Sequence, residues 1–216
     1  MKNTFKTLFI LFLFVCSWGF CAFGAEQIGK TIKVSLSTAF PPQARTTGTS
    51  GANVTNARSL WLQADVKFKT KDEKNAARRF LDNPVLDIQI AVYPSKRAGK
   101  TEKAVVFSGK IDYITLERDG REHYLKALLP SLLFRKYAYD RQLDRTDFVA
   151  KVSYSAGGKV LGTAYGSNKG VQEKEIRNFF NAVPRNAVQA PGTVWGRQGT
   201  TWSIIEVNKY EMEKLR

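Results

Sequence analysis

The chain has few of the residues on which most enzyme sites and small secreted folds depend. Its two cysteines, Cys16 and Cys21, both lie within the first 24 residues, and its one histidine is His123. Without those first residues the chain has no thiol, which excludes cysteine nucleophiles, thiolate metal sites and stabilising disulfides. A single histidine excludes two-histidine zinc sites and requires that any Ser-His-Asp triad use His123. The fold must therefore be held together by a hydrophobic core.

The first 24 residues have the pattern of a secretory signal peptide. Lys2 and Lys6 precede an apolar run over residues 8–16, and the segment closes on Ala22-Phe23-Gly24, a small-x-small cleavage pattern. We expect cleavage after this pattern and export to the periplasm, the outer surface or the medium. The alternative is an uncleaved membrane anchor over residues 8–25, which would tether the protein to the envelope.

The sequence that follows is strongly basic. Removing Lys2 and Lys6 from the 34 basic residues leaves 32, against 19 acidic residues, a net charge of +13. An exported protein with this charge suits an anionic partner such as lipopolysaccharide, a sulfated glycan, mucin or extracellular DNA, although the same charge also favours solubility. Lys and Arg are spread along the chain, so we expect no specific nucleic-acid tail. The most apolar later stretch, residues 127–134, is short and contains Pro130, so we expect a soluble mature protein.

Most of the sequence alternates apolar and polar residues with the period of two that is typical of half-buried strands. The clearest run is residues 85–93, and Asp119-Gly120 and Gly157-Gly158 are turn pairs that predict two hairpins. Further strands are predicted at residues 31–37, 60–69, 104–108, 110–118, 121–129, 148–154, 159–165 and 201–207. Eight or nine strands with this spacing predict a mainly β fold, an antiparallel immunoglobulin-like β-sandwich, with a barrel as the alternative.

One segment has convincing helical periodicity. Ile176, Phe179, Phe180 and Val183 fall at i, i+3, i+4 and i+7 and predict one short helix near residues 171–183 that packs on a sheet. Gly, Ser, Thr and Pro dominate the loop before residue 59. The predicted organisation is therefore a signal peptide at 1–24, an N-terminal strand and flexible loop at 25–58, and a β-sandwich domain at 59–210.

No catalytic, cofactor or metal motif is apparent. His123 follows a turn without a Gly-x-Ser-x-Gly elbow, and we interpret it as a structural or surface histidine. Asp140, Asp144 and Asp147 bring carboxylates close in sequence, but interleaved arginines favour loop salt bridges over a calcium site. We expect no catalytic residue, no metal site and no cofactor, and hence a non-enzymatic protein.

Residues 192–202 are the most suggestive segment for binding. Trp195 and Trp202 are suited to stack on sugar rings, with Arg197 and Gln198 as hydrogen-bond donors. The alternative is that Trp202 belongs to the core of the last strand and that Trp195 packs over the sandwich edge. Packing is the favoured interpretation, because large aromatic side chains are usually buried.

Several short segments resemble small secreted proteins of verrucomicrobial bacteria. They are Leu60-Trp61-Leu62, Arg79-Phe80-Leu81-Asp82-Asn83, Val85-Leu86-Asp87-Ile88, Gly109-Lys110-Ile111-Asp112-Tyr113 and residues 129–137. The resemblance covers about residues 60–165. Some of those proteins are encoded beside type IV pilus-like components and look like immunoglobulin-like sandwiches. The resemblance implies an envelope or pilus-associated structural or adhesive role, and it carries over no site residues.

These observations leave two main functional hypotheses. The first is an exported, non-enzymatic structural or adhesion module of the cell envelope, which binds an envelope or pilus protein or an anionic surface through strand pairing or charge. The second is a carbohydrate-binding protein that uses the segment around Trp195 and Trp202. A hydrolase with a carboxylate pair is a third class and the least favoured.

Overall fold

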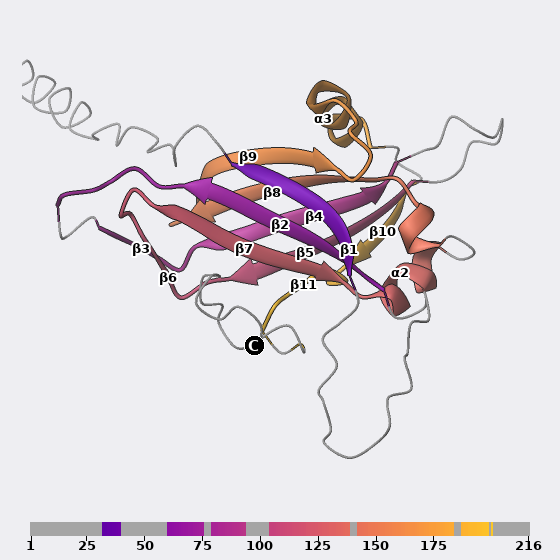
Figure 1. Cartoon of the computed structure of the whole chain (residues 1–216), viewed down its shortest axis with the longest axis horizontal. Helices are drawn as coiled ribbons and strands as arrows, with labels where there is room; N and C mark the ends of the chain where they lie inside the picture. The colour runs from indigo at the N-terminus through magenta and orange to yellow at the C-terminus, as the bar shows by residue number, and fades with distance from the viewer. Residues whose placement is uncertain are drawn as a thin grey trace, which may run out of the picture.

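The computed structural model describes residues 32–39, 60–75, 79–93, 104–138, 142–183, 187–198 and 200. Within these residues the strands form two facing sheets and a small ribbon (Figure 1). The four-stranded sheet has the order β1 (Lys33–Ala39), β2 (Trp61–Lys69), β7 (Glu122–Leu129), β11 (Trp195–Gly196). The five-stranded sheet has the order β10 (Val188–Pro191), β5 (Val105–Asp112), β4 (Val85–Val92), β8 (Phe148–Ala156), β9 (Lys159–Ser167). The ribbon pairs β3 (Phe80–Asp82) with β6 (Thr115–Glu117).

Neighbouring strands are antiparallel, except that β10 runs parallel to β5. The prediction of a mainly β, antiparallel immunoglobulin-like sandwich is therefore confirmed. The predicted N-terminal strand is β1, which pairs with β2 and so belongs to the four-stranded sheet. The predicted leader lies outside the described residues. None of the helices among the described residues is long and apolar enough to cross a membrane.

The core lies between the two sheets and follows from the alternation in sequence. In β2 and β4 the apolar positions point inward, and Leu62, Val66, Ile88 and Ile90 are buried. Ile88 lies opposite Val152 of β8 in register, so neighbouring strands contribute to the same layer. Burial of these side chains supplies the main stabilising free energy of a fold that has no cysteine among its described residues.

One edge of the sandwich is closed by contact between the two sheets. Along β9, Gly162 lies against Ile32, which directly precedes β1. Gly166 lies against the backbone of Val34, which is within β1. A Cβ atom at Gly166 would overlap the carbonyl oxygen of Val34. Glycine at these positions therefore allows β1 to approach β9 closely.

The predicted helix is present as α3 (Glu173–Asn181). Its buried residue, Ile176, packs with Ala91, Val106 and Val149 on the outer face of the five-stranded sheet. A second helix, α2 (Ser131–Ala138), was not predicted. It directly follows β7, and in sequence its apolar residues look like a continuation of that strand.

Three strand predictions need correction. The predicted strand at 110–118 is divided between β5 and β6, and residues 187–198, for which no strand was predicted, contain β10 and β11. The chain bends at Asp119-Gly120, but β6 and β7 do not pair across this bend, because β6 pairs with β3 and β7 with β2. By contrast, Gly157-Gly158 joins β8 to β9 in the predicted hairpin. The strand predicted at 201–207 lies outside the described residues.

Candidate functional site

The described part of the segment considered for sugar binding contains β11, at the edge of the four-stranded sheet. Trp195 begins β11 and lies opposite Leu128 of β7. The chain reaches it through a turn at Gly192, whose φ of 69° is in the left-handed region that favours glycine. The indole Nε1–H of Trp195 donates to the carbonyl oxygen of Gly192 at 3.1 Å, which fixes the orientation of the ring.

Trp195 packs against Trp61, at the start of β2, in a T-shaped contact with ring centroids 6.3 Å apart and an interplanar angle of 75°. We call these two residues the aromatic edge. Trp195 remains 43% exposed, so one indole offers open aromatic surface. Sequence reasoning missed Trp61, although its position on the polar, outward face of β2 was a usable signal. Trp202, the partner predicted for Trp195, lies outside the described residues.

The two predicted hydrogen-bond donors have different surroundings. Arg197 is only 3% exposed, whereas Gln198 is partly exposed. The guanidinium of Arg197 is therefore buried and does not share the open surface of Trp195. Of the predicted binding residues that the structure describes, Trp195 and Gln198 reach solvent.

The outer face of the same sheet carries paired charges. Lys126 Nζ donates to Gln63 Oε1 at 2.8 Å and lies 3.1 Å from Asp65 Oδ1, and Lys126 is buried. Further along, Lys67 Nζ lies 2.7 Å from Glu122 Oε2. Their hydrogen bond raises the pKa of Lys67 and lowers that of Glu122. On this face of the sheet, Lys126 and Lys67 are thus each paired with a neighbouring carboxylate.

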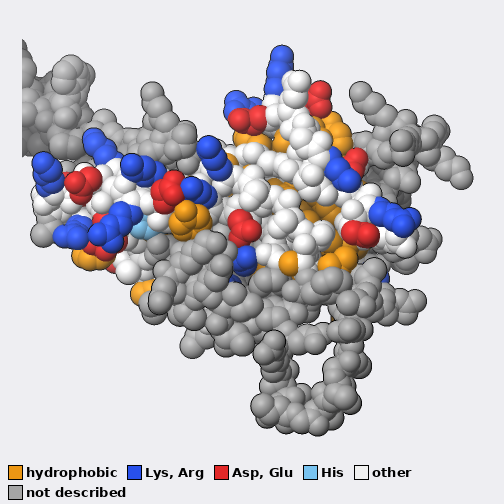
Figure 2. Space-filling model, viewed as in Figure 1, with side chains coloured by type: hydrophobic (Ala, Val, Ile, Leu, Met, Phe, Trp, Pro, Cys, Tyr) orange, Lys and Arg blue, Asp and Glu red, His pale blue; other side chains and the backbone are white. Residues whose placement is uncertain are grey.

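At the other end of β2, polar side chains surround a hollow of about 410 Å³. We call this region the polar end. Figure 2 shows Lys and Arg side chains gathered near this end of the molecule, with Asp and Glu among them. The residues that line the hollow come from the segment after β2, the β3–β6 ribbon and the turn before β7: Asp72, Glu73, Lys74, Arg79, Glu117, Asp119 and Arg121.

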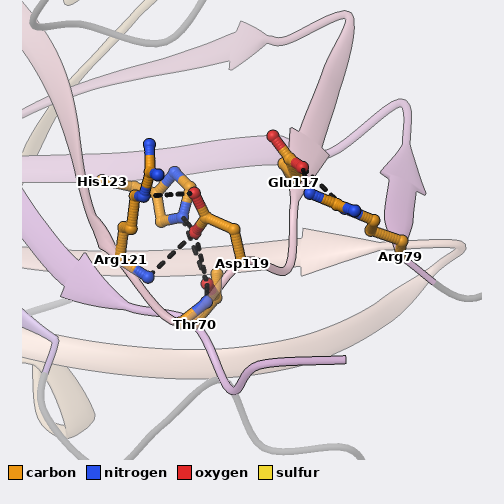
Figure 3. A network of polar contacts seen from close by, with 7 residues as sticks. Thr70, Arg79, Glu117, Asp119, Arg121 and His123 are labelled. Carbon is orange, nitrogen blue, oxygen red and sulfur yellow. Dashed lines mark hydrogen bonds and ion pairs between the residues drawn. The ribbon is translucent and has the colours of Figure 1, made fainter. Parts of the chain in front are cut away.

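His123 lies beside this hollow, on the inward face of β7, and is only 5% exposed. Its Nε2 is 3.1 Å from Thr70 Oγ1 and 3.2 Å from Asp119 Oδ1 (Figure 3). The ring stacks on Phe68, with centroids 5.5 Å apart and an interplanar angle of 21°. The histidine therefore joins the hydrophobic core to the charged surface.

Asp119 is held as a carboxylate. Burial opposes its ionisation, but the backbone N–H of Arg121, at 2.9 Å, and the charge of His123 outweigh that effect. The pKa of Asp119 consequently lies below its ordinary value. At neutral pH this side chain is an acceptor for both the backbone and the imidazole.

This cluster differs from a catalytic triad. In a triad the acid binds one ring nitrogen of histidine and the nucleophile binds the other. Here Thr70 and Asp119 both meet Nε2 of His123, and Thr70 is itself buried. Of the two interpretations offered for His123, its burial agrees with the structural one.

One ion pair lies across the ribbon, and another joins the ribbon to the segment after β2. Arg79 Nε donates to Glu117 Oε1 at 2.7 Å across the β3–β6 ribbon, and Arg118 lies 3.3 Å from Glu73. Sequence reasoning missed this region because its partners lie far apart in the chain. Within the described residues, no three His, Cys, Asp or Glu side chains form a group able to hold a metal ion. Asp144 lies in a short 3-10 helix, η3 (Leu143–Arg145).

Comparison with known proteins identifies a likeness in fold. No protein-family model matches the chain, and no curated protein matches it. A crystal structure of a protein from Akkermansia muciniphila is similar, with a TM-score of 0.59 and 13% sequence identity, over 86% of this chain and 95% of that chain. At this identity the likeness shows the fold alone. Its source is a verrucomicrobial bacterium, the group that the sequence resemblance indicated.

Proposed function

We propose that the protein is an exported, non-enzymatic structural or adhesion module of the cell envelope, associated with a pilus-like assembly, that works by binding an anionic surface. The sandwich fold, shared with a verrucomicrobial protein, is compatible with this role. The resemblance of the sequence to secreted proteins encoded beside pilus-like components supports the setting.

One observation carries the proposal: at the polar end, potentially reactive groups are buried while lysines are open. His123 and Thr70 are enclosed in one hydrogen-bonded cluster. Lys69, Lys71 and Lys74, which follow one another along the same segment, are exposed. Exposed cations attract anionic surfaces over a distance of about 10 Å at moderate salt, whereas a buried histidine offers no access to substrate.

Contact through open sheet edges has less support than contact through charge. Long, flat edges are the ones that readily accept a strand from a partner. Among the residues that the structure describes, the edge strand β10 of the five-stranded sheet has four residues, and the edge strand β11 of the four-stranded sheet has two. The remaining edge strands, β1 and β9, lie against each other. Charge is therefore the favoured mode of binding.

The test compares two triple variants that change net charge equally. In the first, Lys69, Lys71 and Lys74 become Glu; in the control, Lys159, Lys169 and Lys174, all exposed on the side of the five-stranded sheet, become Glu. Binding is measured to agarose beads that carry a sulfated glycan, with uncharged agarose as the blank, over a salt series. We expect the first variant to lose about tenfold more affinity than the control, and added salt to weaken wild-type binding.

Two results would contradict this proposal. Equal losses in both variants would mean that net charge alone, and not the polar end, drives binding. Wild-type binding that does not respond to salt would mean that the basic charge serves solubility. Capture of partners from native envelope membranes by both variants would then show whether a protein ligand depends on the same lysines.

A second candidate function is carbohydrate binding at the aromatic edge, which the exposed indole of Trp195 favours. Aromatic faces stack on the apolar faces of sugar rings. The test is binding to a glycan array by Trp195→Ala, with Phe80→Ala as the control, because Phe80 is a similarly exposed aromatic residue on β3. Loss of binding in the first variant alone supports this function. An unchanged profile in Trp195→Ala, with the fold intact, excludes it.

A further inference from the structure

Among the long strands that the structure describes, β1 and its neighbour β9 each bury a single side chain, Leu36 and Ala164 respectively. Of the seven residues of β1 only Leu36 is buried, at 8% exposure, and the others are partly or fully exposed. Its main chain, in contrast, is paired along its full length with β2, from Lys33 opposite Lys67 to Ala39 opposite Trp61. Backbone pairing, which does not depend on sequence, therefore holds β1 along its whole length, together with packing of Val34 and Leu36 on the core.

The place that β1 occupies has a definite shape. On one side is the edge of β2, whose N–H and C=O groups need partners. On the other side, the inward positions of β9 are Gly162, Ala164 and Gly166, and the two glycines touch Ile32 and Val34. The position between β2 and β9 therefore accepts a strand that pairs with the backbone of β2 and packs against the small residues of β9. In this structure β1 occupies that position.

The connection between β1 and β2 is much longer than their pairing requires. Adjacent antiparallel strands can be joined by a turn of two residues. Here residues 40–60, twenty-one in all, separate the two strands. Twenty-one residues reach about 70 Å when extended, which is enough for β1 to lie on a neighbouring molecule.

We propose that β1 is an exchangeable strand and that its partner is a second copy of this chain. In the exchanged assembly, β1 of one copy lies between β2 and β9 of the other, in the register seen here. The same contacts form in both arrangements, since the inserted strand is identical, and only the connection changes course. Strand exchange does not depend on binding to an anionic surface, so an experiment can contradict either proposal without affecting the other.

Thiol cross-linking tests the proposal directly. Lys33 and Lys67 lie opposite each other in register, and both side chains reach solvent, so Lys67→Cys removes only an exposed ion pair with Glu122. One preparation carries Lys33→Cys and the other carries Lys67→Cys with a tag of different mass. In the exported form, or with Cys16 and Cys21 changed to Ser where the leader is retained, these are the only thiols. The two are mixed at high concentration, incubated, and oxidised.

Exchange predicts a disulfide between the two copies. The control mixes Lys33→Cys with Lys151→Cys, whose cysteine lies on β8 opposite Tyr165, on the outer face of the five-stranded sheet. We expect mixed dimers of Lys33→Cys and Lys67→Cys to form at least about tenfold faster than control dimers, because paired strands raise the effective concentration of the two thiols. Equal rates in the two mixtures would overturn the proposal.

A double variant gives a second, independent result. In Lys33→Cys with Lys67→Cys in one chain, an unexchanged molecule forms its disulfide internally and runs as a monomer without reductant. An exchanged assembly forms it between chains. The fraction of covalent oligomer should therefore rise with protein concentration, while Gln89→Cys with Lys151→Cys, a pair opposite each other on β4 and β8, should remain internal. Internal disulfides at every concentration in both variants would contradict exchange.

Discussion

The two ends of β2 are built in opposite ways. At its first residue, Trp61 packs against Trp195, and that indole leaves 43% of its surface in solvent. Near its last residues, Phe68 stacks on the buried imidazole of His123, and Thr70 hydrogen-bonds to the same ring. One end thus exposes apolar surface, and the other buries polar groups.

This difference predicts that the two ends of β2 contribute unequally to stability. A buried polar group that loses its partner destabilises the fold by about 1–3 kcal/mol, so the cluster around His123 constrains the fold. An exposed aromatic ring contributes less to stability and remains free to contact a ligand. Substitutions at the polar end should therefore lower the free energy of unfolding more than substitutions at the aromatic edge do.

The largest effect is expected from His123→Ala. This change removes the stacking on Phe68 and takes the imidazole partner from Thr70 and Asp119, which should lower the free energy of unfolding by about 3 kcal/mol. Urea denaturation measures it. His123→Gln is the matched control, since its amide can still hydrogen-bond, and it should lose less. A loss below about 1 kcal/mol for His123→Ala would mean that the cluster is not a stabilising feature.

The next effect concerns pH. Because the pKa of Asp119 in the folded state lies below its ordinary value of 3.8, its ionised form stabilises the fold at neutral pH. That contribution is complete above the unfolded-state pKa and is lost as pH falls from there through the folded-state pKa. Asp119→Asn should lower stability at pH 7 by about 1 kcal/mol and flatten the decline below pH 3.8.

The measurement is urea denaturation of the wild-type protein and of Asp119→Asn at a series of acid pH values. The expected curves converge at low pH, where the wild-type carboxyl is protonated and resembles the amide in charge. Parallel curves over the whole series would mean that Asp119 does not carry the pH dependence. Asp144→Asn, in η3 and away from the cluster, is the control and should leave the curve unchanged.

The fold could be predicted from the sequence where the signal is local. Alternation identified β2, β4 and β8, and Gly157-Gly158, with φ of 55° and 75°, marked a hairpin that is present. The missed elements depend on distant contacts. In α2, which is only eight residues long, Phe134 packs on Phe107 and Phe148, and no window of sequence contains that arrangement.

The sites show the same limit. Trp195 was identified because glycines and a second indole surround it in sequence, but its aromatic neighbour is Trp61, more than a hundred residues away. In the same way, the pairing of Arg79 with Glu117 and of Thr70 with His123 follows from the register of strands, which composition does not contain. Residue types were predictable, and their juxtaposition was not.

At the aromatic edge, effects on stability should be smaller. Trp61→Ala and Trp195→Ala should each lower the free energy of unfolding by about 1 kcal/mol, and the double variant should show a coupling of about 1 kcal/mol or less. A thermodynamic cycle from urea denaturation measures the coupling. A loss as large as that of His123→Ala would show that this end also supports the fold, and the contrast between the ends would fail.

The smallest effect is expected from Arg121→Ala, and it tests what holds Asp119. The side chain of Arg121 is 85% exposed and its Nε lies 3.6 Å from Asp119 Oδ2, so solvent screens most of that attraction. The backbone N–H of the same residue donates to Asp119 Oδ1 at 2.9 Å and survives the substitution. Stability should therefore change by less than about 0.5 kcal/mol, and the acid decline should remain. A larger loss of stability, with a smaller decline at acid pH, would mean that the side chain of Arg121, and not its backbone N–H, holds Asp119. The polar end would then depend on an exposed contact, as the aromatic edge does.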